Sequence, residues 1–383
     1  NNMQDLLVQF GRGRTPLLRS ATMMLCLGLI ASLVPTSNAA DASRPEKIKP
    51  LKIDGVIAAI HSPFSKRGEL DLTKVQAQAE WLNSTGVKWI FLTGTTGESV
   101  KMNQKEREAL VEEWEAVEKR FGYGIRSIVH VGCENIGTAK KLARHAKAHG
   151  ASAIAAMAPS FFRPISTIAL ANTMALVANE VPGLPFYYYH IPHMTNVAFS
   201  DGMMGLTRAF ESIGVVNYAG VKYTGLYINQ GLADATELHN YESGKFEVLS
   251  GREEIMLGTL SMGITGNVGS QFNVLGDLYN YFRDTYLKGD LSKARKLQAL
   301  CTSFMDVWKS NVEPGMDGFK NAVNLIPSIS VGDARYPSVP FSKESEDKLR
   351  LSILKWCENE TVDGWPKKSR YCRELCDADT CSA

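Results

Sequence analysis

The sequence predicts a (β/α)8 barrel followed by additional C-terminal helices, and three observations lead to this fold class. Eight short apolar runs alternate with amphipathic segments from Leu51 onward, over roughly 220 residues, which is the size of such a barrel. The runs are apolar throughout, as expected for parallel strands covered on both faces. Finally, the residues with the strongest chemical signal lie near the ends of predicted strands or directly after them, and the carboxyl ends of these strands meet at one mouth.

Strands and helices can be placed in order along the chain. The predicted strands are Gly55–Ile60, Trp89–Thr93, Ser127–Gly132, Ala153–Ala158, Phe186–Ile191, Ala219–Tyr223, Phe246–Ser250 and Gly266–Ser270. Helices are predicted between them, including Leu72–Ser84, Gln104–Arg120, Ile136–His149 and Ser166–Glu180, and beyond them at Leu275–Leu287, Leu291–Asn311, Gly315–Leu325 and Lys343–Cys357. The alternative is a doubly wound open sheet, but the first strand–helix turn lacks both a GxGxxG pattern and a Walker lysine.

The 383 residues are expected to divide into five segments. These are a signal peptide (1–40), a linker (41–50), the barrel (51–274), C-terminal helices packed on it (275–357) and a cysteine-rich tail (358–383). The chain is 44% hydrophobic and 21% charged, as in an ordinary globular protein with a large core. Its formal charge of +2 favours neither nucleic acid nor a membrane surface as a partner.

The first forty residues have the layout of a secretory signal. Arginines precede an apolar stretch at 21–34, and Pro35 leads to small residues ending at Ala40. The apolar stretch is short for a membrane span, although an uncleaved anchor is the alternative. We therefore expect a secretory or extracellular location, or a cytoplasmic one if this segment does not act as a signal.

Four cysteines fall in the last 27 residues: Cys357, Cys372, Cys376 and Cys381. Behind a signal peptide, such a cluster predicts two disulfides, with three possible connectivities. A zinc site is the competing interpretation, but the cluster lacks histidine and paired CxxC spacing.

Lys222 is the strongest candidate for a catalytic group. It lies near the end of the apolar run Tyr218–Thr224, where a charged ammonium is costly to bury. Burial lowers the pKa of a lysine, and only the neutral amine can attack a carbonyl carbon. The position therefore predicts Schiff-base chemistry.

Two other segments are expected at the same mouth. Tyr189 lies near the end of the fifth strand, on the same face as Tyr187 by alternation. The segment Thr93–Ser99 links the second strand to a helix with small residues and backbone amides that can hold a carboxylate. An amine, a phenol and an anion site together suggest an enzyme acting on a 2-oxo acid.

These motifs resemble the N-acetylneuraminate lyase and dihydrodipicolinate synthase family of class I aldolases. The resemblance covers about Leu51 to Leu325, with GTTGES (94–99), YYYHIP (187–192), GVKYT (220–224), SGREE (250–254) and GNVGS (266–270) in order. It implies that Lys222 forms the imine with pyruvate and that Tyr189 relays protons. It also implies a homotetramer, and neither a cofactor nor a metal ion.

The resemblance further assigns the substrate-binding residues. Thr95 and Thr96 are expected to bind the carboxylate of the 2-oxo acid. The rest of the sugar acid is expected to contact Thr224, Gly251, Glu253, Glu254 and Ser270.

Within the family, the lyase branch fits better. The synthase branch carries an arginine two residues after the proline of YYYHIP, whereas this chain has Met194 there and no arginine before Arg208. The expected reaction is cleavage of N-acetylneuraminate to N-acetylmannosamine and pyruvate. The alternatives are another pyruvate-dependent aldolase, acting on a 2-keto-3-deoxy sugar acid or resembling the synthases, and a catalytically inactive secreted barrel that binds sugars.

Two departures from the lyase pattern concern sugar specificity. Position 253 is glutamate where the lyases usually have aspartate. Phe161 and Phe162 occupy a loop in which many relatives present a tyrosine across a subunit interface.

Three other polar residues are assigned structural roles: His130 and His190 in the core, and Glu98 in the first turn of a helix, where the dipole favours a carboxylate.

Overall fold

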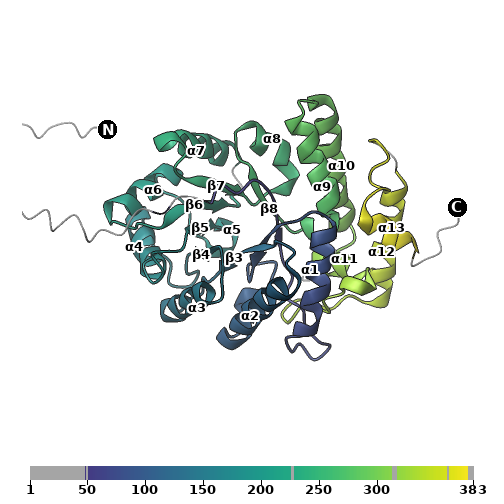
Figure 1. The fold of residues 1–383 in the computed structure, drawn as a ribbon, viewed down its shortest axis with the longest axis horizontal. Helices are drawn as coiled ribbons and strands as arrows, with labels where there is room; N and C mark the ends of the chain where they lie inside the picture. Colours follow the sequence, from purple (N-terminus) through teal and green to yellow (C-terminus); the bar gives the residue numbers. More distant parts are fainter. Residues whose placement is uncertain (1–47, 49–50, 226–227, 313–316, 360–361, 378–383) are drawn as a thin grey trace, which may run out of the picture. The chain divides into compact units, whose positions relative to one another are not determined.

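The computed structural model describes residue 48 and residues 51–225, 228–312, 317–359 and 362–377. In this part of the chain, eight parallel strands form a closed barrel in sequential order, with β8 pairing back to β1 (Figure 1). This confirms the predicted (β/α)8 barrel. The predicted signal segment 1–40 lies outside the described residues, and so does the linker 41–50 apart from residue 48.

The strands match the predicted runs to within one or two residues at each end. They are β1 Gly55–Ala59, β2 Trp89–Leu92, β3 Arg126–His130, β4 Ala153–Met157, β5 Phe186–His190, β6 Tyr218–Tyr223, β7 Glu247–Ser250 and β8 Gly266–Gly269. Almost all of their residues are buried, because side chains fill the interior and helices cover the exterior.

Alternation along β5 and β6 determines which side chains enter the barrel. Tyr187 and Tyr189 pack with the interior cluster, whereas Tyr188 packs with the outer core beneath the helices. The β5–β6 pairing is irregular after Phe186, and Gly220 lies in the irregular stretch with φ +147°. A Cβ at Gly220 would lie 1.8 Å from the carbonyl oxygen of Glu247, so only glycine fits there.

The helices between the strands are α1 Val75–Ser84, α2 Gln104–Phe121, α3 Ile136–Ala148, α4 Thr167–Ala178, α5 Pro192–Thr195, α6 Gly202–Ser212, α7 Ile228–Asn240 and α8 Met256–Ser261. They form the outer layer, except for the four-residue α5, which lies within the ring of helices (Figure 1). Local signals fix several ends. The α2 helix, for example, begins at a capping box between Asn103 and Glu106 and ends at Gly122 in the left-handed region.

None of the helices in the described ranges combines the length and apolarity needed to cross a bilayer.

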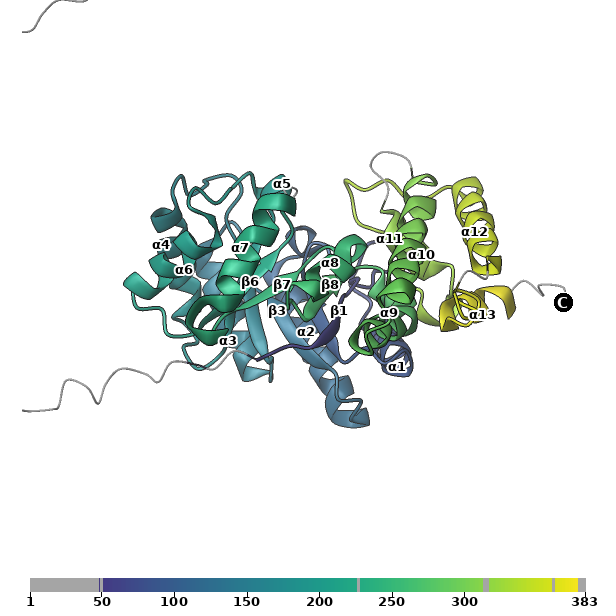
Figure 2. The same ribbon diagram turned by 90° about the horizontal axis from the view of Figure 1, so that it is seen from above.

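In the described residues after β8, the chain forms five further α-helices. They are α9 Phe272–Leu287, α10 Leu291–Lys309, α11 Gly318–Asn324, α12 Lys343–Glu358 and α13 Arg370–Asp377. The α9 helix begins three residues before the predicted Leu275 and packs on β1. Figure 2 shows α10, α12 and α13 beside the barrel, on the side of α1 and α9.

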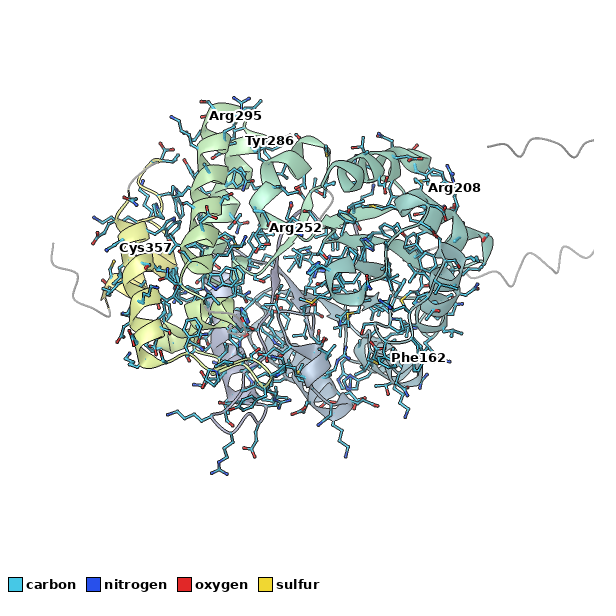
Figure 3. The ribbon with its side chains drawn as sticks, turned by 180° about the vertical axis from the view of Figure 1, so that it is seen from behind. Phe162, Arg208, Arg252, Tyr286, Arg295 and Cys357 are labelled. Atoms are coloured by element: carbon cyan, nitrogen blue, oxygen red, sulfur yellow. A yellow bond between two sulfur atoms is a disulfide. The ribbon has the colours of Figure 1, made fainter. Side chains whose placement is uncertain are left out.

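The cysteine-rich segment contains a helix that the sequence analysis does not predict. The α13 helix packs against α9 and α12, with Tyr371, Cys372 and Leu375 buried. A disulfide joins Cys357 in α12 to Cys372 in α13, and Figure 3 shows Cys357 on this side of the molecule. Cys376 lies partly buried on α13, and Cys381 lies outside the described residues.

Candidate active site

Lys222 lies inside the barrel near the carboxyl end of β6, and only 4% of the residue is exposed. Its Nζ lies 3.7 Å from the ring centroid of Phe91 and 3.8 Å from that of Tyr189. Burial lowers the pKa of Lys222 from 10.5 to about 7, although attraction to Glu253 acts in the opposite direction. A substantial fraction of this lysine is therefore a neutral amine at neutral pH.

Tyr189 is the phenol next to this amine. Its hydroxyl lies 3.2 Å from Oγ1 of Thr95, and its ring meets those of Phe91 and His130 edge-on. Burial raises the pKa of Tyr189 to about 12, and the hydrogen bond with Thr95 limits the shift. The phenol is therefore protonated at neutral pH and can donate a proton to a group bound beside Lys222.

The β2–α2 loop brings Thr95 and Thr96 to the mouth. Thr95 is exposed and Thr96 is half-buried. Oγ1 of Thr96 lies 2.9 Å from Oγ of Ser270, so the loops after β2 and β8 meet there. The turn is tight, because a Cβ at Gly94 would lie 2.7 Å from the Phe91 ring. The β2–α2 loop thus brings hydroxyl groups and backbone amides next to the Tyr189 phenol.

Glu253 is a buried residue of the turn after β7, and its carboxylate holds the loop after β8. It is 6% exposed, and its Oε1 accepts the backbone N–H groups of Ser270 (2.9 Å) and Gln271 (3.2 Å). Its carboxylate occupies the space that a Cβ at Gly269 would fill, at 2.8 Å. Burial, and then repulsion from Glu254, raises the pKa of Glu253 to about 7. The structure therefore gives Glu253 a role in holding the β8 loop and in acting on Lys222.

Thr224 and Gly251 lie against each other beyond the ends of β6 and β7. The Thr224 hydroxyl donates to the backbone carbonyl of His190 at 2.7 Å, and this threonine is buried. A Cβ at Gly251 would lie 2.2 Å from the methyl carbon of Thr224. The Thr224 hydroxyl is thus hydrogen-bonded to the main chain at the carboxyl end of β5.

Glu254 is paired with a cation that the sequence analysis does not identify as a site residue. Its Oε1 accepts from the Arg252 guanidinium at 3.0 Å, and both side chains are about one-quarter exposed. Arg252 also donates to the backbone carbonyl of Thr224 at 3.4 Å, and it lowers the pKa of His193 after the larger effect of burial. In Figure 3, Arg252 lies over the centre of the barrel. Charged neighbours on the β7 loop are the signal that could have identified it.

A buried ion pair supports the Thr95–Thr96 loop from behind. Glu98 accepts from Nζ of Lys320 at 2.7 Å, with side chains 3% and 1% exposed. Lys320 also donates to the backbone carbonyl of Ser62, and Glu98 accepts from Lys101 and from the backbone N–H of Arg335. Glu98 has φ +55° and precedes a short 3-10 turn, so helix-dipole stabilisation at the start of α2 is not the reason for a carboxylate there.

The remaining candidates lie elsewhere. The Tyr187 hydroxyl donates to Glu247 at 2.5 Å, and Glu247 is the first residue of β7, at the opposite end of the strand from Ser250. His190 faces outward and stacks on Phe199, with 3.7 Å between ring centroids. The Nδ1–H of His130 donates to the backbone carbonyl of Thr93 at 2.9 Å. None of the three offers a free polar group beside Lys222.

Comparisons with known proteins show what this chain is similar to. Residues 52–355 match the dihydrodipicolinate synthetase family. The chain is 34% identical over 318 residues to the N-acetylneuraminate lyase of Gallus gallus, covering 81% of this chain and 98% of the relative. It is 32% identical over 311 residues to N-acetylneuraminate lyase A of Xenopus laevis, covering 79% and 97%.

A solved structure shows the same similarity. The N-acetylneuraminate lyase of Aliivibrio salmonicida aligns with a TM-score of 0.71 and 28% identity, covering 80% of this chain and 98% of that one. The family match spans most of the barrel and the C-terminal helices, and two relatives exceed 30% identity over nearly their whole length. The chain therefore belongs to the dihydrodipicolinate synthetase family.

Proposed function

We propose that this chain is a Schiff-base aldolase that cleaves N-acetylneuraminate to N-acetylmannosamine and pyruvate. The observation that carries the proposal is Lys222, a buried lysine with a pKa of about 7 beside the protonated phenol of Tyr189. The similarity to lyases named for this sugar acid supports the choice of substrate.

The reaction would begin with attack of the neutral Lys222 amine on the C2 carbonyl of the open-chain sugar acid. Thr95 and Thr96 would hold the adjacent carboxylate through hydroxyls and backbone amides. The carbinolamine loses water when Tyr189 donates a proton to the leaving hydroxide. The product of this step is a protonated imine between Nζ and C2.

Cleavage uses the imine as an electron sink. Removal of the proton from the C4 hydroxyl, with Tyr189 as the relay, lets the C3–C4 electron pair flow toward the imine nitrogen. N-acetylmannosamine leaves as the aldehyde, and an enamine of pyruvate stays on Lys222. Protonation at C3 followed by hydrolysis releases pyruvate and restores the free amine, so electrons and protons balance without a cofactor or a metal ion.

The test combines trapping with a substrate screen. Borohydride reduction in the presence of pyruvate should inactivate the protein and add the mass of a reduced pyruvate imine at Lys222, located by peptide mapping. Borohydride without pyruvate is the control, and Lys222→Arg should not be trapped, because a guanidinium stays protonated. Trapping at another lysine would contradict the assignment. Pyruvate release from N-acetylneuraminate, N-glycolylneuraminate and 2-keto-3-deoxygluconate then identifies the preferred sugar acid.

We also propose that the protein is a homotetramer, as the family resemblance implies. Exposed aromatic rings on the β4–α4 loop support an interface between subunits: Phe161 is 78% and Phe162 is 85% exposed, and Figure 3 shows Phe162 at the edge of the barrel. Light scattering coupled to size exclusion should give four chains per particle. A monomer at micromolar concentration would contradict the proposal.

A secretory location remains a proposal as well. The charged and apolar pattern of residues 1–40 supports it, as does the disulfide between Cys357 and Cys372, because disulfides persist in oxidising compartments. N-terminal sequencing of secreted protein should find a start near residue 41. Recovery of an unprocessed chain from the cytosol would contradict it.

A further inference from the structure

Two histidines and a glutamate converge on the outer surface of the barrel, between α2 and α3. Glu112 lies on α2, His145 in the last turn of α3, and His149 at the C-cap of that helix. Their ligand atoms all lie within 4.8 Å of one another. We propose that these three residues bind a divalent transition-metal cation of the zinc class, with a water molecule completing the coordination.

The distances are close to those of a metal site. Nε2 of His145 lies 2.8 Å from Oε1 of Glu112, and Nε2 of His149 lies 3.9 Å from the same oxygen. Zinc–ligand bonds of about 2.0–2.2 Å place tetrahedral ligand atoms roughly 3.4 Å apart. The two observed distances lie on either side of this value, so small rotations of side chains would suffice.

The backbone already fixes the arrangement. Residues four apart on a helix share one face, and the two imidazole rings are stacked, with 4.2 Å between centroids and 20° between planes. Leu110, Val111 and Trp114 anchor α2 in the core, and α3 packs alongside it. A cation would therefore bind to a preformed site rather than order a loose one.

A simple ion pair explains the cluster less well. In the part of the chain that the structure describes, the ion-pair partners of Glu112 are these two histidines. An exposed ion pair contributes little to stability. Two imidazoles and one carboxylate are, however, a ligand set that zinc-class cations prefer.

The position of the site separates it from the proposed chemistry. The carboxyl end of α3 leads into the start of β4, whereas Lys222 and Tyr189 lie near the carboxyl ends of their strands. The cation would link α2 to α3 at the other end of the barrel. It should therefore raise thermal stability and leave turnover unchanged.

The experiment uses full-length protein stripped by chelation and titrated with Zn²⁺ alone, by calorimetry and by competition with a chromophoric chelator. We expect one saturable site per chain and a higher melting temperature with Zn²⁺. His145→Ala and His149→Ala should each weaken binding by about 10-fold or more, because loss of groups that merely support ligands already costs about 10–100-fold. Glu112→Gln should weaken it too, with the helices intact by circular dichroism.

His239→Ala is the matched control, because His239 is an exposed histidine near the end of another helix, α7. This variant should bind Zn²⁺ like the unmodified protein. The proposal is overturned if no saturable binding occurs, or if the histidine variants bind as well as the control. If Zn²⁺ binding is lost after thiol alkylation and not in the histidine variants, the metal is bound by cysteines, and the proposal is overturned as well.

Discussion

Tyr189 and Lys222 are register partners on adjacent parallel strands, and Nζ of Lys222 lies 3.8 Å from the centroid of the Tyr189 ring. Besides the attraction to Glu253, two further effects oppose each other at the amine. Attraction of a cation to the rings of Tyr189 and Phe91 favours the charged form by about 0.5–2 kcal/mol. Full burial can shift a lysine pKa by roughly 3–5 units, about 4–7 kcal/mol, in favour of the neutral form. Burial is the larger effect, so the pKa stays well below 10.5.

The first prediction concerns the pH dependence of catalysis. Because Lys222 has a pKa of about 7, kcat/KM for pyruvate release should rise about tenfold per pH unit below pH 7 and level off above it. An ordinary lysine would keep the rate rising toward pH 10. The Glu253 carboxylate raises the pKa of Lys222, so Glu253→Gln should move the midpoint to lower pH. A midpoint that stays in place or moves upward would show that Glu253 does not act on Lys222.

The second prediction concerns Tyr189. Tyr189→Phe should lower kcat by about 10²–10⁴-fold with a small change in KM, because a proton relay acts mainly in the transition states. Tyr187→Phe is the matched control, since its hydroxyl donates to Glu247 at the start of β7. Steady-state kinetics of both variants decides the matter. Near-normal kcat in Tyr189→Phe would transfer the relay to another group.

The third prediction concerns stability. The unfolded chain keeps Lys222 protonated up to about pH 10.5, whereas the folded protein releases the proton above about pH 7. Folding therefore carries a cost that is complete below pH 7 and disappears as the pH rises through 10.5. Lys222→Met should abolish activity yet stabilise the protein by on the order of a few kcal/mol at pH 6, and by progressively less toward pH 10. Urea unfolding at several pH values measures this difference, and equal stability at pH 6 would contradict the burial of a costly amine.

The sequence predicts the barrel well because its signals are local. Each strand is a short apolar run, and helix ends carry caps such as Asn103 and Gly122. The convergence of Lys222, Tyr189 and the Thr95–Thr96 loop follows from their positions at or just beyond the carboxyl ends of strands in one barrel. Features that depend on local sequence, such as strands and helix caps, can thus be predicted from the sequence alone.

Long-range contacts account for what the sequence analysis misses. Lys320 meets Glu98 across 222 positions, through a C-terminal helix whose placement no local pattern specifies. Glu253 has the sequence context of an exposed turn, yet its carboxylate is buried against the backbone amides of Ser270 and Gln271. The helix α13 contains four charged residues among eight, so its sequence alone gives little sign of a buried helix. Its apolar face is buried because it packs against α9 and α12.

The fourth prediction concerns the ion pair behind the substrate loop. Lys320→Met should destabilise the protein by about 3–5 kcal/mol, because it leaves the buried Glu98 carboxylate without its main partner. Glu98→Gln combined with Lys320→Met should cost less than the sum of the two single changes. Urea unfolding of the four proteins gives the coupling energy, and strict additivity would contradict a direct interaction. Since Glu98 follows Thr96 by two residues, both single variants should also raise KM more than they lower kcat.

The last prediction concerns the sugar acid and rests on Met194, Arg252 and Glu254. Without an arginine two residues after Pro192, aspartate semialdehyde has no cation at that position, so dihydrodipicolinate synthesis should be negligible. A nine-carbon sugar acid can instead reach the Arg252–Glu254 pair on the β7 loop, where hydrogen bonds to charged groups contribute about 1.5–3 kcal/mol. We expect N-acetylneuraminate to give a higher kcat/KM than 2-keto-3-deoxygluconate, and Glu254→Ala to narrow the ratio by about 10-fold or more. Arg252→Ala tests whether the sugar acid contacts the Glu254 carboxylate alone or the Arg252–Glu254 pair. If it contacts the pair, both variants should narrow the ratio of kcat/KM values to the same extent. If the unmodified enzyme prefers the six-carbon acid, the chain is a 2-keto-3-deoxy sugar acid aldolase that uses the same Lys222 chemistry.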